Sequence, residues 1–589
     1  DATVNGVTVG KGANSVAQNT VLGNAALDAN TTGQNNTAVG QETLTANTTG
    51  NSNTGIGWGA LYTNTTGSSN TAVGRESLYL NAASNNTAVG YRSLYVNTTG
   101  TSLVAVGYQA LDANTTGNDN HAFGWNALSS NTTGTNNVAV GSQALVSNTT
   151  ASNNTAVGLE ALKLNTTGTL NTAVGSKSLD ANTTGQENTA LGYEALTKNT
   201  TASYNTAVGA YALEDNTTGA SNTAVGYQSL VENTTASNNT GIGYFALKTN
   251  TTGTKNTAVG AYALDANTTS DGNTAVGYNA LTGNTTGSNN VAVGDRSLDE
   301  NTTGENNTAI GQHALGAITT GSYCTAIGQG ALYNNTANDN TAVGNHCMLA
   351  NTSGTSNTAV GEAALDANTT GQQNNAFGHN ALGGNTTGSY NVAIGEQSLY
   401  ASNGSDNTGC GHRTLQANTT GNYNTAVGAN ALDAATTASY NTALGVNSLG
   451  ACTTGQYNTG CGRGSMSNMT TGDTNTACGY DAGVNLTTGA NNLFLGYAAG
   501  KSTSPSGAVT TGDNNVVLGN NSIQHLYCAD TSISSSDARD KTDVTDFTHG
   551  LSWIKELRPV TYRWDRRTWY SDDKSVTPDG SKKRDRLHI

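Results

Sequence analysis

The chain has 589 residues, of which 73 are glycine and only 3 are proline, and 11% of its residues are charged. Ordinary globular domains contain far more charged residues and less glycine, so this composition excludes a mixed globular core. The formal net charge is −15. Such a surplus of negative charge repels a phosphate backbone, so nucleic acid is not an expected partner. No stretch approaches the roughly 18 apolar residues of a membrane-spanning helix.

After an N-terminal lead-in segment of residues 1–22, one glycine recurs along most of the chain. It closes each Asn-Thr-Ala-Val-Gly sequence, from Gly23 to Gly496, at steps of 17 and occasionally 16 residues. Each unit combines short Thr- and Val-containing runs with Gly and Asn turns, which favours strands over helices. We therefore predict that residues 23–500 form an all-β shaft, a parallel β-solenoid or β-roll of about 29 coils with one 17-residue unit per coil.

Each unit contains two adjacent apolar pairs, represented by Ala38-Val39 and Ala60-Leu61. Successive side chains of a strand point to opposite faces, so one residue of each pair is expected to face outward. A 17-residue coil encloses too little volume to hide all four side chains. We infer that the outward ones pack against sister chains in an oligomer. The closing glycine never changes within the repeat, so it needs a positive φ or close backbone contact.

Asparagine recurs in the turns of the repeat, where stacked coils are expected to align its side chains into ladders. Each Asn-Thr-Thr is also formally an acceptor for N-glycosylation. We favour the turn interpretation, because the fold itself repeats the turn. The glycosylation candidates under the other interpretation are Asn30, Asn47, Asn64 and Asn114.

Aromatic residues directly follow the repeat glycine in several coils. If that position faces water, the rings can stack on the sugar rings of a host-surface glycan. The alternative, which we favour, is stacking between coils that stiffens the rod. The candidate glycan-binding residues are Trp58, Tyr91, Tyr108, Trp125 and Tyr193.

The seven cysteines all lie in the second half and form no CxxC pair and no zinc spacing. Cys410, Cys461 and Cys478 stand where other units have valine, so we expect small buried hydrophobes there. His313 and His346 lie two coils apart, about 10 Å, which is too far to share a metal within one chain. We predict no metal site, no cofactor and no glycan-cutting active site in the shaft.

The register breaks after Gly496, and a segment containing Ser and Pro follows at residues 502–506. This pattern predicts a neck over residues 501–533. Twelve of the 24 Lys and Arg residues lie beyond residue 538, which indicates a separate domain over residues 534–589, a small α+β unit.

The Asn-Thr-Ala-Val-Gly-x-x-Ser/Ala repeat resembles the heads of trimeric autotransporter adhesins and of related phage fibres, over residues 4 to about 500. Those heads are trimers of left-handed parallel β-rolls. The resemblance therefore implies that this chain is one strand of a homotrimer, in a virion or extracellular location.

Residues 535–544 (SSDARDKTDV) and 550–564 (GLSWIKELRPVTYRW) resemble the endosialidase-type intramolecular chaperone. In that family the domain trimerises, folds the fibre ahead of it and is released by self-cleavage before the Ser of a Ser-Asp motif. The resemblance implies Ser536 and Lys541 as the catalytic residues and makes 534–589 the N-terminal part of such a domain. A Ser hydroxyl becomes nucleophilic when a neighbouring base, here Lys541, removes its proton.

These features predict a structural and adhesive fibre, a phage tail fibre that mediates host attachment and is folded by its C-terminal chaperone. A bacterial cell-surface adhesin or extracellular filament is the first alternative. A glycan depolymerase spike with no visible active site is the second. The only enzymatic activity expected is autocatalytic self-cleavage.

Overall fold

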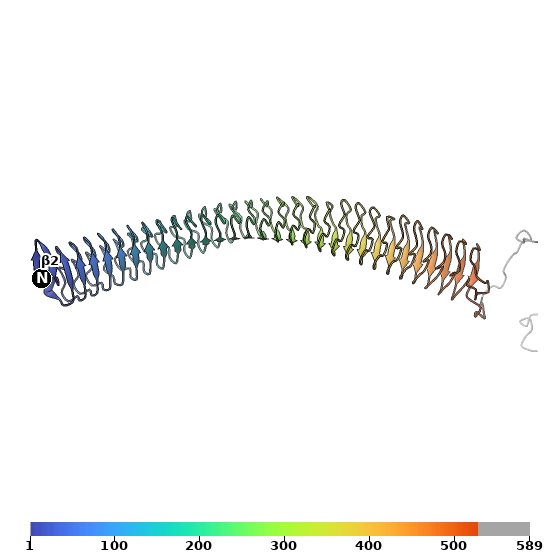
Figure 1. Cartoon of the computed structure of the whole chain (residues 1–589), viewed down its shortest axis with the longest axis horizontal. Helices are drawn as coiled ribbons and strands as arrows, with labels where there is room; N and C mark the ends of the chain where they lie inside the picture. Colours follow the sequence, from blue (N-terminus) through green and yellow to red (C-terminus); the bar gives the residue numbers. More distant parts are fainter. Residues whose placement is uncertain (1, 528–589) are drawn as a thin grey trace, which may run out of the picture. The chain divides into compact units, whose positions relative to one another are not determined.

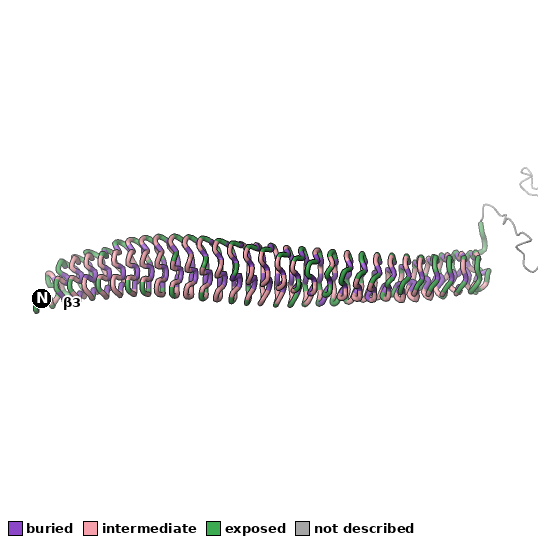
Figure 2. Tube along the Cα trace, turned by 90° about the horizontal axis from the view of Figure 1, so that it is seen from above, coloured by how far each residue is buried: buried purple, intermediate pink, exposed green. Residues whose placement is uncertain are grey.

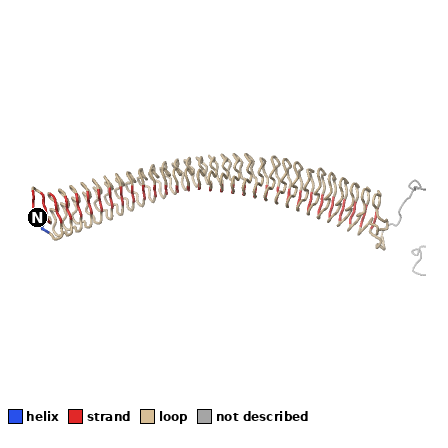
Figure 3. The backbone as a smooth tube through the Cα atoms, in the orientation of Figure 1, coloured by secondary structure: helices blue, strands red, loops and turns tan. Residues whose placement is uncertain are grey.

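The computed structural model describes residues 2–527, which consist of short strands joined by turns and one 3-10 helix, η1 (Ala13–Ser15). Thirty strands, from β3 (Thr20–Gly23) to β32 (Val516–Leu518), form one parallel ladder (Figures 1 and 3). The predicted all-β parallel solenoid with a 17-residue repeat is confirmed, with about 28 turns. Within residues 2–527 we find no helix of the length and apolar character that crossing a bilayer requires.

Nearly all strands of the ladder have three residues and begin 17 residues after the previous one. The strands between β3 and β32 are β4 (Thr37–Val39), β5 (Thr54–Ile56), β6 (Thr71–Val73), β7 (Thr87–Val89), β8 (Val104–Val106), β9 (His121–Phe123), β10 (Val138–Val140), β11 (Thr155–Val157), β12 (Thr172–Val174), β13 (Thr189–Leu191), β14 (Thr206–Val208), β15 (Thr223–Val225), β16 (Thr240–Ile242), β17 (Thr257–Val259), β18 (Thr274–Val276), β19 (Val291–Val293), β20 (Thr308–Ile310), β21 (Thr325–Ile327), β22 (Thr341–Val343), β23 (Thr358–Val360), β24 (Asn375–Phe377), β25 (Val392–Ile394), β26 (Thr408–Cys410), β27 (Thr425–Val427), β28 (Thr442–Leu444), β29 (Thr459–Cys461), β30 (Thr476–Cys478) and β31 (Leu493–Leu495).

Every strand of the ladder places one residue inward and its two neighbours outward. In β11, Ala156 is fully buried, whereas Thr155 and Val157 lie at the surface. The pairing is in register, so Ala156 stacks on the corresponding alanines of β10 and β12. The same register aligns the outward Thr and Val side chains into two rows along the shaft. Figure 2 shows the buried positions recurring in coil after coil.

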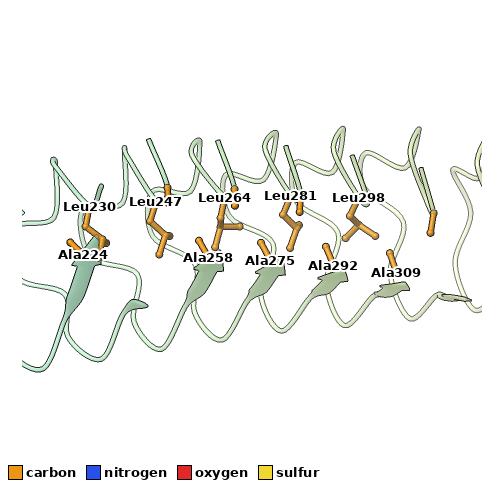
Figure 4. Packing of buried hydrophobic residues seen from close by; sticks show 14 of the residues in the cluster. Ala224, Leu230, Leu247, Ala258, Leu264, Ala275, Leu281, Ala292, Leu298 and Ala309 are labelled. Carbon is orange, nitrogen blue, oxygen red and sulfur yellow. The ribbon is translucent and has the colours of Figure 1, made fainter. Parts of the chain in front are cut away.

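The second apolar pair does not lie in a strand, which corrects our prediction for it. Ala60 and Leu61 are both fully buried. Leu61 has a φ of 56°, in the left-handed region, so the chain is not extended there and both side chains can enter the coil. Equivalent leucines face the strand alanines across the interior (Figure 4). Of the two apolar pairs, only the one in the strand therefore leaves a side chain outside the coil.

Both expected constraints on the closing glycine are found at Gly40. Its φ is 133°, and a Cβ there would lie 2.6 Å from the carbonyl oxygen of Gly57 in the next coil. No side chain fits at that distance. The backbones of successive coils are therefore in contact at this corner, which explains why the repeat never varies there.

The two ends of the ladder differ from the coils between them. Strands β1 (Ala2–Val4) and β2 (Val7–Gly10) form an antiparallel hairpin, and β2 pairs antiparallel with β3, so the hairpin covers the N-terminal edge of the ladder. At the other end the ladder continues past residue 500, where we predicted a neck. Strand β32 pairs in register with β31 across a longer coil. The compact unit that holds the ladder ends at Ile523.

The interior adjusts locally where glycine replaces the inward alanine of a strand. In β5 this residue is Gly55, and a Cβ there would lie 2.5 Å from Cγ2 of Thr43 in the preceding coil. The Thr43 hydroxyl donates to the Gly57 carbonyl at 2.7 Å, which holds that side chain in place. Gly241, Gly409 and Gly460 likewise face hydroxyl-bearing side chains, those of Ser229, Ser398 and Ser448.

Gly55→Ala should therefore lower the free energy of unfolding by about 1–3 kcal/mol, the usual cost of overpacking a core. In a Thr43→Ala background most of this cost should disappear, because Ala stacked on Ala is the arrangement of the neighbouring coils. Chemical denaturation of the four chains of this double-mutant cycle measures the coupling. Equal costs in the two backgrounds would contradict the proposed contact.

Candidate functional surfaces

The asparagines of the Asn-Thr-Thr turns form the expected ladder in the interior of the solenoid. Asn47 Nδ2 donates to Asn30 Oδ1 at 3.0 Å and to the Gly50 carbonyl at 3.1 Å. Asn64 repeats both bonds one coil later. A second ladder links the asparagines that precede most strands, where the backbone N–H of Asn53 donates to Asn36 Oδ1 at 3.0 Å.

The ladder geometry favours the turn interpretation of Asn-Thr-Thr. Asn30, Asn47, Asn64 and Asn114 are fully buried, and a glycan on Nδ2 would have to replace their hydrogen bonds. A buried amide that loses its partners costs about 1–3 kcal/mol. The folded shaft therefore does not present these residues for glycosylation, and they act as turn and ladder residues.

The five predicted aromatic residues lie on the surface, but most of them contact another ring. Tyr91 stacks on Tyr108 with centroids 5.2 Å apart, Trp58 lies 6.5 Å from Tyr79, and Tyr193 contacts a ring of the next coil edge-on. Trp125 is 48% exposed. Among residues 2–527 no ring contact of Trp125 is found, so no other aromatic ring covers its indole faces.

Two further aromatic columns escaped the sequence analysis. Tyr423, Tyr440 and Tyr457 stack five residues before the closing glycine, with centroids 5.0 Å apart. Tyr62 and Tyr79 stack five residues after it, at 4.9 Å. Their 17-residue spacing is visible in the sequence, but these rings lie away from the repeat glycine. In a stacked column the rings cover one another's faces, so these columns stiffen the shaft and present mainly ring edges.

Half-buried aspartates recur at one position of the coil, five residues after the closing glycine. Burial raises the pKa of each of these carboxyls above its ordinary value, because the charged form loses water. At Asp366 the nearby His346 opposes this effect, yet Oδ1 has no hydrogen-bond partner. The aspartates concerned are Asp112, Asp180, Asp265, Asp299, Asp366 and Asp433.

Asp366→Asn should stabilise the shaft at neutral pH and have little effect near pH 3. Because the pKa is raised by folding, the folded chain binds the proton more tightly. Asp366 therefore favours folding below the ordinary Asp pKa of about 3.9, and this contribution is lost as the pH rises through the raised pKa. Denaturation midpoints at both pH values measure the change. Glu305→Gln, on an exposed turn, is the control, and equal shifts for both variants at pH 7 would refute the burial effect.

The cysteines of residues 2–527 divide into a buried group and a group at the surface, and the three for which we expected burial belong to the second. Cys324, Cys347 and Cys452 are buried, and burial raises the pKa of the Cys347 and Cys452 thiols to about 12. Cys410, Cys461 and Cys478 occupy outward strand positions. They are not buried, so our prediction of burial for these three residues was wrong. Cys461 and Cys478 are register partners in adjacent strands. Within residues 2–527 no group of three potential metal-binding side chains occurs.

The segment after the shaft lies outside the described residues, and the comparison with known families addresses it. A model of the family described as Chaperone of endosialidase matches residues 536–589. The shaft therefore leads into a chaperone-of-endosialidase segment. The match begins at Ser536, and Ser536, Lys541 and the predicted α+β unit all fall within the undescribed part. No curated protein matches the chain.

Proposed function

We propose that the protein is a phage tail fibre, a homotrimeric structural and adhesive rod of the virion that reaches or grips a host surface. The observation that carries this proposal is the order of the two parts: an uninterrupted parallel ladder of thirty strands followed by a match to the Chaperone of endosialidase family. A long, uniform ladder is suited to spanning distance, and the chaperone-like segment to assembling it.

The uniformity of the shaft gives a physical reason for a chaperone. Each coil contacts only its neighbours, so folding can begin at many places and propagate. Because nearly every coil has the same Thr-Ala-Val strand, a pairing that slips by one coil costs little. Three chains therefore need one fixed starting point to align. A trimerising segment that follows the ladder in the sequence supplies that point.

The proposal includes release of this segment by self-cleavage before Ser536. The Ser536 hydroxyl is the nucleophile, and Lys541 is the base that accepts its proton. A chaperone that is cut off after assembly leaves the trimer kinetically trapped, since the released segment no longer lowers the barrier to separation. The support for this step is the position of the family match.

Ser536→Ala should abolish cleavage, whereas Ser535→Ala should leave it intact. Both variants and the parent are expressed from a gene that contains this whole chain and are compared by mass spectrometry. The parent and Ser535→Ala are expected to lose the segment that starts at residue 536, and Ser536→Ala to retain it. Identical masses for the two variants would remove Ser536 from the proposed role.

The adhesive part of the proposal assigns glycan stacking to Trp125. Trp125→Ala should weaken binding to host-surface polysaccharide about 2- to 10-fold, if one stacked ring contributes about 0.5–1.5 kcal/mol. Tyr440→Ala, in the middle of a stacked column, is the matched control and should bind like the parent. Titration of labelled fibre with the polysaccharide measures this. Unchanged binding of Trp125→Ala would exclude this site, and shortening of the polysaccharide would instead favour a depolymerase.

A further inference from the structure

One face of the solenoid carries an apolar row that the coil does not cover. In each strand from β3 to β32 the last outward-facing residue is Val, Ile, Leu, Phe or Cys, from Leu22 to Leu518. We call this row the strand-face ridge. In-register pairing places each member directly beside the next, as in Val140, Val157 and Val174. Leu191, for example, is 47% exposed.

The ridge carries no charged side chain. No Lys, Arg, Asp or Glu occupies any position of strands β3 to β32. The charged side chains of the repeat stand instead on the turns, as Glu42, Arg75 and Asp271 do. Beside the ridge runs the row of first strand residues, mostly Thr. The hydroxyls of Thr155 and Thr172 make no hydrogen bond within residues 2–527, which leaves them free to bond outside the coil.

The dimensions of the ridge determine which partner can cover it. At about 4.8 Å per strand the ridge extends for roughly 140 Å. An apolar strip of that length is unusual on a monomer, where exposed apolar patches rarely exceed a few hundred Å² in area. A globular partner would cover only a few coils. A second copy of this chain has the same spacing and length, and an interface of thirty strand residues reaches the 20–30 residues per side of stable complexes.

We infer that the strand-face ridge is the surface through which the chains of the fibre pack against one another, with the aromatic columns and charged turns left outside. This inference rests on the proposed homotrimer and adds which face is buried in it. The ridges of the copies meet along a common axis, and the adjacent threonine hydroxyls bond across the boundary. The apolar area removed from water then stabilises the assembly along its whole length.

Native cysteines make the inference testable by cross-linking. Cys410 lies on the ridge between Ile394 and Val427, so the nearest ridge thiol is that of another copy. The experiment uses the full chain with Cys461, Cys478 and Cys528 replaced by Ala. Diamide then oxidises two Cys410 thiols to one disulfide and is itself reduced to the hydrazine with the two protons. The remaining buried cysteines are shielded, and their high pKa values keep them unreactive.

Light scattering should first give a trimer mass, and diamide should then produce a disulfide-linked dimer whose yield does not depend on protein concentration. The control adds Cys410→Ala and Tyr400→Cys, which moves the thiol to an exposed turn one coil earlier, and no cross-link is expected. A trimer that cross-links through Tyr400→Cys and not through Cys410 would overturn the inference but keep the fibre. A monomer mass would overturn the proposed function itself.

A charge substitution provides an independent second test. Ile327 on the ridge and Tyr333 on a turn are each 38% exposed, so the pair matches in burial. Ile310→Lys with Ile327→Lys should reduce the trimer fraction, because the added charges would meet at the axis. Tyr323→Lys with Tyr333→Lys should leave it unchanged. Circular dichroism checks that both chains retain β-structure, and equal trimer fractions for the two folded variants would contradict the ridge as interface.

Discussion

The contact between the closing glycines of successive coils is the constraint on which the whole structure depends. At Gly40 the backbone approaches the next coil so closely that a single Cβ would overlap a carbonyl group. This contact brings each strand within hydrogen-bonding distance of the next, and it repeats every 17 residues because each coil must return to the same corner. The parallel ladder, the stacked core and the surface rows all inherit their register from it.

The interior of the shaft combines an apolar half with a polar half. Leucine and alanine pack beneath the strand, while the two asparagine ladders occupy the turns and satisfy one another from coil to coil. The dependence of each ladder asparagine on the next is visible where the ladder is interrupted. Ile318 replaces one ladder asparagine, and Asn301 Oδ1 in the preceding coil is left without a partner. Each amide in the ladder thus depends on its neighbours, which makes the shaft cooperative along its axis.

Repetition stabilises the shaft, but it also leaves the pairing of coils poorly specified. Thirty similar strands provide continuous hydrogen bonding, but they contain little information about which coil should lie beside which. Exceptions such as Phe123 and Phe377 on the ridge mark only a few coils. Under the proposed function, the chaperone-like segment at residues 536–589 aligns the chains at one end and so supplies the register that the repeats lack. The outer face of the strands carries one continuous apolar row, and this row is the surface that we propose as the interface between identical rods.

The sequence by itself determined the fold class, the period, the asparagine ladders and the special role of the closing glycine, because each follows from residues that recur at one spacing. It also indicated the chaperone-like segment, whose motifs are local. Only the tertiary structure decided that Leu61 points inward beside Ala60, since a left-handed residue cancels the alternation assumed for a strand. Only the tertiary structure likewise showed that the ladder continues past residue 500, where a longer coil still brings β32 into register with β31. The structure also showed that Cys347 is buried whereas Cys410 lies at the surface, and that Asn30 is fully buried. A side chain's direction depends on how the whole coil closes, and spacing along the chain does not contain that information.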